Sequence, residues 1–324
     1  MHQFGRLPWR ESHRHFWSAD IFRDGSFGFY STLLDKLSAI VYSDQVTAMW
    51  RFSHGDAAGK VSSPFLYPTM IQEICRVIRL EALSVGTWRL FLAAPVIAAR
   101  VHAGQFVMVG IGAGYDPLLR RPFSVHFAEN GRLVLYFRVV GKGTEMLAAL
   151  RPGNKLSLLG PLGNGFTLTQ APARLVGGGI GIAPLLLLAK ELADQGGAAS
   201  AIILAGRAKA EVAPLAASFQ PWTKNLIFAT DDGSFGMPGR AGDALASLPP
   251  APGAVVYACG PQPMLAAIAC FCRDKNMKCQ VSVESAMACG MGACLGCARP
   301  VAAGGHVHVC LDGPVFDAEA LPWN

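Results

Sequence analysis

The spacing of hydrophobic residues differs between successive segments of the chain. From 74 to 159 the apolar runs are short or alternate with polar positions, and Gly, Pro and Asn separate them. Several short strands at this spacing are typical of a small antiparallel β-barrel. The predicted strands lie at 75–83, 87–93, 106–111, 121–127, 133–139 and 155–159.

From residue 173 the rhythm changes to strands that alternate with helices. A strand at 173–176 leads through a glycine turn into a helix at 184–195. Strands that alternate with helices form a parallel sheet. The remaining predicted elements are strands at 201–205, 226–230 and 255–259 and a helix at 263–276.

The two ends of the chain lack such regularity. Within 1–70 the predicted element is a short amphipathic helix at about 31–42, and 284–324 has no regular period but is dense in Cys and Gly. We therefore expect a multi-domain protein. Its parts are an N-terminal extension over 1–70, an antiparallel β-barrel domain over 71–168, an α/β domain with a parallel sheet over 169–282 and a small C-terminal domain over 283–324.

Composition and charge narrow the class of protein. Of the 324 residues, 52% are hydrophobic and 15% charged, and the mean hydropathy is +0.33, which excludes a disordered chain. No uninterrupted apolar run reaches the roughly 18–20 residues of a membrane-spanning helix. The formal charge is +6, but Lys and Arg form no dense block, so we expect neither a membrane nor a nucleic acid as partner. Because the first twenty residues show no secretory signal, we expect a cytoplasmic protein.

The nine cysteines are unevenly placed, since Cys75 stands alone and all the others follow residue 258. Cys289, Cys294 and Cys297 have the spacing C-x4-C-x2-C, and twelve residues separate Cys310 from the third. Four thiolates are what one [2Fe-2S] cluster requires, and this is the plant-type spacing. Glycines between them let the backbone wrap closely and direct N–H groups at sulfides. These four cysteines are therefore predicted to ligate a [2Fe-2S] cluster.

Other interpretations of the cysteines are weaker. Zinc usually takes paired C-x2-C motifs, of which only one exists, and unligated buried thiols are a further alternative. A mixed cluster with His306 and His308 is disfavoured because four cysteines already fill the site. A second site is disfavoured because Cys270 and Cys272 point about 200° apart on the predicted helix. We expect core thiols at Cys259, Cys270, Cys272 and Cys279.

A glycine turn at 177–184 carries candidate nucleotide chemistry. It reads Gly-Gly-Gly-Ile-Gly-Ile-Ala-Pro, follows a strand and opens a helix, where backbone N–H groups can bind a pyrophosphate. The full dinucleotide fingerprint is not met, because Pro184 replaces the last glycine and Arg207 follows the second strand where an acidic residue is expected. A tight turn without a ligand is the alternative.

Two barrel loops carry candidate flavin chemistry. The run Arg120-Arg121-Pro122-Phe123-Ser124 supplies a cation, a rigid turn, a ring and a hydroxyl. Arg can bind diphosphate oxygens by paired hydrogen bonds, and a Ser hydroxyl can donate to a flavin nitrogen. A second glycine loop follows at 140–144, with a helical start at 145–150. Each alone is most often a hairpin corner, but their order before the glycine turn favours a flavin and a nicotinamide nucleotide.

Six motifs occur in an order that resembles one known family. They resemble the electron transfer subunits of NAD-dependent class 1B dihydroorotate dehydrogenases. These subunits belong to the ferredoxin–NADP reductase superfamily. The likeness runs from about Ile71 to the C-terminus and is specific, because the cysteines follow the nucleotide domain and their last spacing is twelve residues. The motifs are Arg121-Pro122-Phe123-Ser124, Gly141-Lys142-Gly143-Thr144, the glycine-rich run at 160–166, the turn at 177–184, Cys259-Gly260-Pro261-Gln262-Pro263-Met264 and the cysteines at 289–310.

The resemblance implies a role for each matching residue. Ser124 would lie near the flavin N5 and Cys259 near the point of hydride transfer, as the two catalytic residues, and Arg121 would bind the FAD diphosphate. The residues 230–233 would lie at the nucleotide's edge. FAD would be bound by Arg121, Pro122, Phe123, Ser124, Tyr136, Phe137, Arg138, Gly143 and Thr144; NAD by Gly178, Gly179, Gly181, Cys259, Gly260 and Pro261; and the cluster by Cys289, Cys294, Cys297 and Cys310.

The resemblance also implies an oxidoreductase of pyrimidine biosynthesis. Electrons would come from dihydroorotate through FMN in a separate catalytic subunit, cross the [2Fe-2S] cluster and FAD, and leave as NADH. Two copies of each subunit would form a heterotetramer. The alternatives are a related reductase subunit of the sulfhydrogenase or ferredoxin–NAD(P) oxidoreductase type, and a redox-sensing interaction module.

The first seventy residues depart from the family pattern. They would be either a partner-binding extension or the product of an upstream start codon, with Met70 as the true first residue. We favour the second account.

Overall fold

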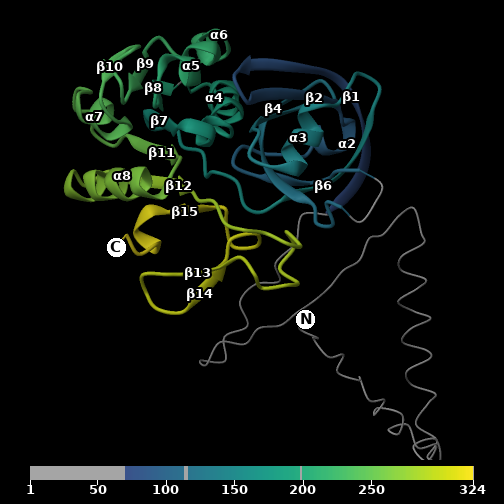
Figure 1. Ribbon diagram of the computed structural model, residues 1–324. Coiled ribbons are helices and arrows are strands. Elements are labelled where there is room, and N and C mark those ends of the chain that lie inside the picture. Colours follow the sequence, from purple (N-terminus) through teal and green to yellow (C-terminus); the bar gives the residue numbers. More distant parts are fainter. Residues whose placement is uncertain (1–69, 113–115, 198, 324) are drawn as a thin grey trace, which may run out of the picture. The chain divides into compact units, whose positions relative to one another are not determined.

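The computed structural model describes residues 70–112, 116–197 and 199–323 (Figure 1). The helix predicted at 31–42 lies outside the described residues. Within the described ranges, no helix has the length and apolar character needed to cross a membrane.

A closed barrel forms the first part of the described chain (Figure 1). Its strands pair in the order β1-β2-β5-β4-β3-β6, and every pairing is antiparallel. Leu90, Val125 and Leu135 are among the side chains that fill its interior, since alternate residues of a strand face the same side. The predicted barrel and its strands are confirmed, with the bounds β1 Ile71–Ser84, β2 Thr87–Ala93, β3 Phe106–Gly110, β4 Arg121–Glu129, β5 Arg132–Arg138 and β6 Lys155–Leu162; two short helices accompany them, α2 Pro95–Ala98 and α3 Lys142–Ala148.

A seven-stranded sheet in the order β10-β9-β8-β7-β11-β12-β15 forms the second part. Neighbouring strands from β10 to β12 run parallel, and every residue of the central strands β7 (Ala173–Gly178) and β11 (Val255–Cys259) is buried. Burial along the whole strand is typical of a parallel sheet covered on both faces. The other strands are β8 Ala199–Gly206, β9 Leu226–Thr230, β10 Met237–Pro238 and β12 Lys278–Ser282, and the helices are α4 Leu185–Asp194, α5 Lys209–Val212, α6 Ala216–Phe219, α7 Ala241–Ala246 and α8 Gln262–Asp274.

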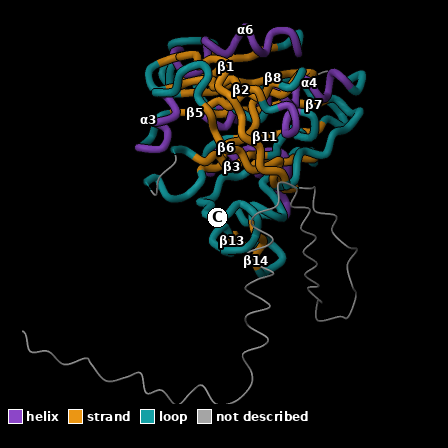
Figure 2. The backbone as a smooth tube through the Cα atoms, turned by 90° about the vertical axis from the view of Figure 1, so that its right-hand side faces the viewer, coloured by secondary structure: helices purple, strands orange, loops and turns teal. Residues whose placement is uncertain are grey.

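The predicted parallel sheet and its elements at 173–176, 184–195, 201–205, 226–230, 255–259 and 263–276 are confirmed within a few residues. The C-terminal segment is mostly loop, as Figure 2 shows, in agreement with its irregular sequence. Its regular pieces are the antiparallel pair β13 (Ala298–Pro300) and β14 (His306–His308) and the strand β15 (Val315–Asp317), which pairs antiparallel with β12.

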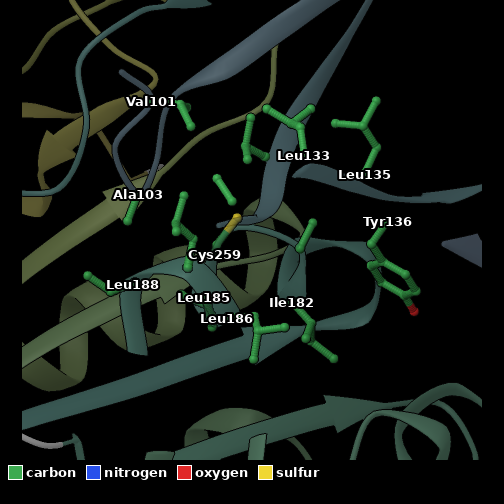
Figure 3. Close-up of a cluster of buried hydrophobic side chains, with 14 of the residues drawn as sticks. Val101, Ala103, Leu133, Leu135, Tyr136, Ile182, Leu185, Leu186, Leu188 and Cys259 are labelled. Carbon is green, nitrogen blue, oxygen red and sulfur yellow. The ribbon is translucent and has the colours of Figure 1, made fainter. Parts of the chain in front are cut away.

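Buried side chains of the barrel and of the α/β domain belong to one hydrophobic cluster. Figure 3 shows Leu133, Leu135 and Tyr136 of β5 in this cluster together with Ile182, which precedes α4, and Leu185, its first residue. Polar contacts reinforce the junction: Arg89 Nη1 donates to Ser218 Oγ (2.7 Å), and Glu191 Oε2 accepts from the Ala103 N–H (3.1 Å).

Candidate cofactor and cluster sites

The predicted cysteine ligands come together from two segments of the C-terminal region. The β13–β14 hairpin places Cys297 beside Cys310, because Ala298 pairs with His308 and the Val309 N–H donates to the Cys297 carbonyl (3.1 Å). The two sulfurs are 3.2 Å apart and both side chains are buried. Cys289 is half-buried and Cys294 is exposed, in the loop that leads to Cys297.

Backbone N–H groups surround these sulfurs. Cys289 Sγ accepts from Met291 and Cys294 (3.4 Å each), and Cys310 Sγ accepts from Gly292 (3.1 Å). Backbone hydrogen bonds, chiefly that of Gly296, lower the pKa of Cys294 to about 7. A thiolate is the form that binds metal, so this environment suits a ligand.

Left-handed backbone makes this wrapping possible. Gly290 (φ 73°), Gly292 (φ 80°) and Leu295 (φ 56°) all lie in that region. A Cβ at Gly290 would lie 2.6 Å from Met108 Cγ of β3, so the loop reaches the barrel only with glycine there. The predicted role of the interspersed glycines is thus visible as a close backbone approach.

The number and kind of these side chains suit a [2Fe-2S] cluster, which takes four cysteine ligands. Cys297 lies beside Cys310, with 3.2 Å between the sulfurs, and the Cys294 N–H donates to Cys289 Sγ (3.4 Å). Among the described residues, no group of three or more His, Cys, Asp or Glu side chains is placed to hold a metal ion.

Three of the remaining α/β cysteines are core thiols, as predicted, whereas Cys270 lies outside the core. Cys259, Cys272 and Cys279 are buried and Cys270 is half-buried, and none forms a disulfide. The thiols of Cys272 and Cys279 contact each other, and this hydrogen bond lowers the pKa of Cys272.

At the barrel, Arg121 lies over the start of α3. A Cβ at Gly143 would be 3.1 Å from Arg121 Nε, so glycine leaves room for the guanidinium there. Thr144 closes the loop: its Oγ1 donates to the Gly141 carbonyl (2.8 Å) and accepts from the N–H of Val140 (2.9 Å). The motifs at 121–124 and 141–144 are therefore brought together, as a diphosphate site requires.

The aromatic residues predicted to line the flavin face two directions. The Tyr136 ring lies 5.4 Å from that of His126, whereas the Phe137 ring lies 6.0 Å from that of Phe123, because consecutive strand residues point to opposite sides. The Ser124 hydroxyl is half-buried, and within the described part of the chain it makes no hydrogen bond that would occupy it.

The predicted nucleotide loops touch each other. A Cβ at Gly181 would lie 2.5 Å from Gly260 N, and Cβ atoms at Gly178 or Gly260 would overlap Met264. Gly179 differs, since its φ is +57° and nothing lies within 4 Å of its Cβ direction. Gly179 is thus the residue of this turn that faces open space, while the others allow the two loops to pack.

Cys259 ends β11 between Gly177 of β7 and Ser282 of β12. Burial, and then the charge of Glu284, raise the pKa of the Cys259 thiol to about 12. The side chain is therefore a neutral thiol at physiological pH.

Three further residues of these sites were not predicted from the sequence. His126 is fully buried and its Nδ1–H donates to the Ala183 carbonyl (2.8 Å). Glu211 accepts from Arg207 through Oε1 (2.7 Å from Nη2) and also from Arg138 of the barrel (3.3 Å). The third, Asn164, lies in the motif at 160–166, for which no residue role was predicted. For Glu211, the (i, i+4) spacing from Arg207 is the available sequence signal.

Comparison with known proteins identifies the family. The model of the iron–sulfur cluster binding domain of dihydroorotate dehydrogenase B matches residues 284–322. The dihydroorotate dehydrogenase B (NAD(+)) electron transfer subunit of Geobacillus thermodenitrificans is 38% identical over 255 residues, which cover 76% of this chain and 97% of that protein. The chain belongs to this family. The corresponding subunit of Bacillus caldolyticus is 41% identical over 240 residues, covering 72% of this chain and 91% of the relative.

Solved structures agree with the fold of this family member. An NADH-dependent reduced ferredoxin–NADP oxidoreductase has a TM-score of 0.70 at 26% identity, over 77% of this chain and 90% of that one. An Amycolatopsis cytochrome P450 reductase has a TM-score of 0.53 at 25% identity, over 66% of this chain and 68% of that one. The predicted resemblance and fold class are confirmed.

Proposed function

We propose that this chain carries electrons from a partner dihydroorotate dehydrogenase subunit, which holds FMN, through a [2Fe-2S] cluster and FAD to NAD+, in pyrimidine biosynthesis. The observation that carries the proposal is the approach of Cys297 to Cys310, together with the backbone N–H groups that donate to the sulfurs of Cys289 and Cys310 in a loop packed on barrel strand β3. The names of the relatives support it.

FAD would be held by the barrel over 71–168. Arg121, over the start of α3, would bind the diphosphate, and the Thr144 hydroxyl would keep the neighbouring loop closed. The Ser124 hydroxyl would donate to the flavin N5. When bound, a flavin can take part in hydride transfer with NAD(H) and in single-electron transfer with an iron–sulfur cluster. The remaining FAD contacts would come from Pro122, Phe123, Tyr136, Phe137, Arg138 and Gly143.

NAD(H) would be held by the α/β domain over 169–282. Gly179 presents open backbone beside the strand end, and the contact of Gly181 with Gly260 would fix the second loop against it. Cys259, as a neutral buried thiol, would form part of the wall of the nicotinamide pocket without adding charge. Gly178 and Pro261 would complete the site.

The partner would dock at the cluster domain over 283–324. Met291 and Leu295 are 39% and 58% exposed and flank the exposed Cys294. Exposed apolar side chains beside a redox centre favour a protein contact there. We propose a catalytic FMN subunit as this partner, two copies of each chain in the complex, and a cytoplasmic location.

Anaerobic purification of the chain alone tests the proposal. We expect flavin and cluster absorption bands together, iron and acid-labile sulfide in equal amounts, and bleaching by NADH. We also expect no oxidation of dihydroorotate until the catalytic subunit is added. A colourless, iron-free protein would contradict the proposal.

A second candidate is a ferredoxin–NAD(P) oxidoreductase subunit. The likeness to the solved NADH-dependent reduced ferredoxin–NADP oxidoreductase favours it. Rapid reduction of ferredoxin by NADH, together with failure to restore NADH formation from dihydroorotate in the presence of the catalytic subunit, would establish this candidate instead.

A further inference from the structure

Asn164 connects the end of barrel strand β6 to the segment that follows Cys310. Its backbone N–H donates to the Gly313 carbonyl (2.6 Å), and its side-chain Nδ2 donates to the carbonyls of Leu311 (2.9 Å) and Asp312 (3.0 Å). All three acceptors lie within three residues of Cys310. One side chain of the barrel thus fixes the backbone of the fourth-cysteine segment.

Gly163 makes this approach possible. Its φ is +72°, and a Cβ there would lie 2.6 Å from the Gly313 carbonyl oxygen and 2.9 Å from the ring of Phe106. The Gly163 carbonyl accepts from Gln105 Nε2 (2.8 Å), which ties the turn to the barrel. The turn is therefore held on both sides, and Asn164 has one position from which to donate.

The segment that Asn164 holds also shapes the surroundings of the Cys310 sulfur. Leu311 packs on Gly292 so closely that a Cβ at Gly292 would overlap its side chain. The Gly292 N–H donates to Cys310 Sγ (3.1 Å), and the Cys310 N–H donates to Cys297 Sγ (3.5 Å). A shift of the Leu311 backbone would therefore disturb the N–H donors on which the potential of a cluster depends.

The first cysteine loop contacts the same side of the barrel. Gly290 packs on Met108 of β3. On the same strand, two residues before Met108, Phe106 pairs with Ser124 of β4. Apolar packing is not directional, so it does not by itself fix where the cysteine segments lie along the barrel strands. The hydrogen bonds of Asn164 are directional and fix this position for the segment after Cys310.

We propose that Asn164 is a positioning residue, which holds the Cys310 side of the cluster site at a fixed place on the flavin barrel. The proposal rests on the proposed function, because it assumes a cluster on the cysteines and FAD in the barrel. Asn164 acts through Leu311 and Asp312 and is not itself assigned to a cofactor.

Asn164→Asp and Asn164→Ala test this in the full-length, anaerobically purified protein. Aspartate keeps the size of the side chain but loses the donating amide, and it faces two carbonyls with its own oxygens. Asn154→Ala is the matched control, because it removes a barrel asparagine whose Oδ1 accepts from the Arg151 N–H (2.7 Å) on another loop. Iron and flavin content, the EPR spectrum of the dithionite-reduced cluster and the rate of cluster reduction by NADH would be measured.

We expect both Asn164 variants to retain flavin and to show a changed EPR line shape. Reduction of the cluster by NADH should be about tenfold slower, which is the size of effect common when residues behind metal ligands are mutated. Asn154→Ala should match the wild type. A wild-type EPR spectrum and rate in Asn164→Asp, or the same loss in Asn154→Ala, would overturn the proposal. Wild-type protein that lacks iron or flavin would instead overturn the proposed function.

Discussion

The sulfur of Cys297 lies 3.2 Å from the sulfur of Cys310, although twelve residues separate them in the sequence. The β13–β14 hairpin accounts for this approach, since it turns the chain back before Cys310 is reached. Two thiolates so placed can share one iron, which leaves Cys289 and Cys294 for the second.

Cys310→Ser should remove the cluster and leave the flavin. Loss of one ligand disrupts the four-cysteine set, whereas the barrel motifs at 121–124 and 141–144 are untouched. Iron analysis and EPR of the reduced protein should show no cluster, and NADH should still bleach the flavin band. Cys270→Ser, which changes a half-buried thiol on α8, is the control and should keep its iron. Equal iron loss in both variants would contradict this assignment.

Arg121→Ala should weaken FAD binding by about 2 kcal/mol, roughly thirty-fold in Kd, because hydrogen bonds to a charged group are lost. The cluster should remain at its normal content. Titration of the flavin-free protein with FAD measures the change. Arg132→Ala, at the exposed start of β5, should bind FAD as the wild type does.

Gly181→Ala should raise the KM for NADH and lower the stability. The added methyl group would meet the Gly260 backbone at 2.5 Å, so the two nucleotide loops must separate. Gly242→Ala is the matched control, since nothing lies within 4 Å of the Cβ direction in α7 and alanine favours helix by up to about 1 kcal/mol. Steady-state kinetics and thermal melts of both proteins would be compared. Normal kinetics in Gly181→Ala would show that the loop contact is not needed.

Glu211→Gln should increase the use of NADPH relative to NADH. Arg207 follows β8, where a bound adenine ribose is expected, but Glu211 Oε1 holds its Nε (3.0 Å) and Nη2 (2.7 Å). The neutral amide would hold this guanidinium less strongly because the charge is lost, so Arg207 could turn to a 2′-phosphate, and the ratio of the two kcat/KM values should rise about tenfold. Asp194→Asn, which neutralises an (i, i+4) partner of Lys190 on α4, should leave the ratio unchanged.

His126→Leu should remove part of the acid sensitivity of the protein. Burial lowers the pKa of folded His126 to about 4, whereas the unfolded residue titrates near 6.5. Between these pH values the unfolded chain binds one more proton than the folded protein. The contribution of His126 to the free energy of unfolding is therefore fully present well above pH 6.5 and is lost as the pH falls toward 4. The loss from neutral pH to pH 5 is about 2 kcal/mol for this group. Urea unfolding of both proteins across that range should show a smaller loss for the variant, and parallel curves would refute the assignment.

Elements with a strong local pattern were predictable from the sequence, and those that depend on distant partners were not. The barrel strands alternate regularly, and the glycine turn before α4 is explicit. In contrast, β12 (Lys278–Ser282) has a weak pattern and forms because β11 and β15 pair with it. A helix between β9 and β11 is expected from the alternation of strands and helices, but the bounds of α7 were not predictable because Ala241–Ala246 is a short stretch next to Gly and Pro.

The same distinction applies to the site residues. Cysteine spacing predicted the four thiols because a cluster imposes that spacing on the chain. The burial of His126 against Ala183 depends on how the barrel meets α4, and the bond from Arg138 to Glu211 joins residues 73 positions apart. No local sequence pattern encodes such contacts, since each needs the assembled fold.

The antiparallel strand β15 covers the outer side of β12, whose backbone donors and acceptors would otherwise be free to pair with another molecule. β15 begins five residues after Cys310, so a proposed cluster ligand and the strand that covers this sheet edge lie in one short segment. A change that displaces this segment would uncover the edge and favour self-association.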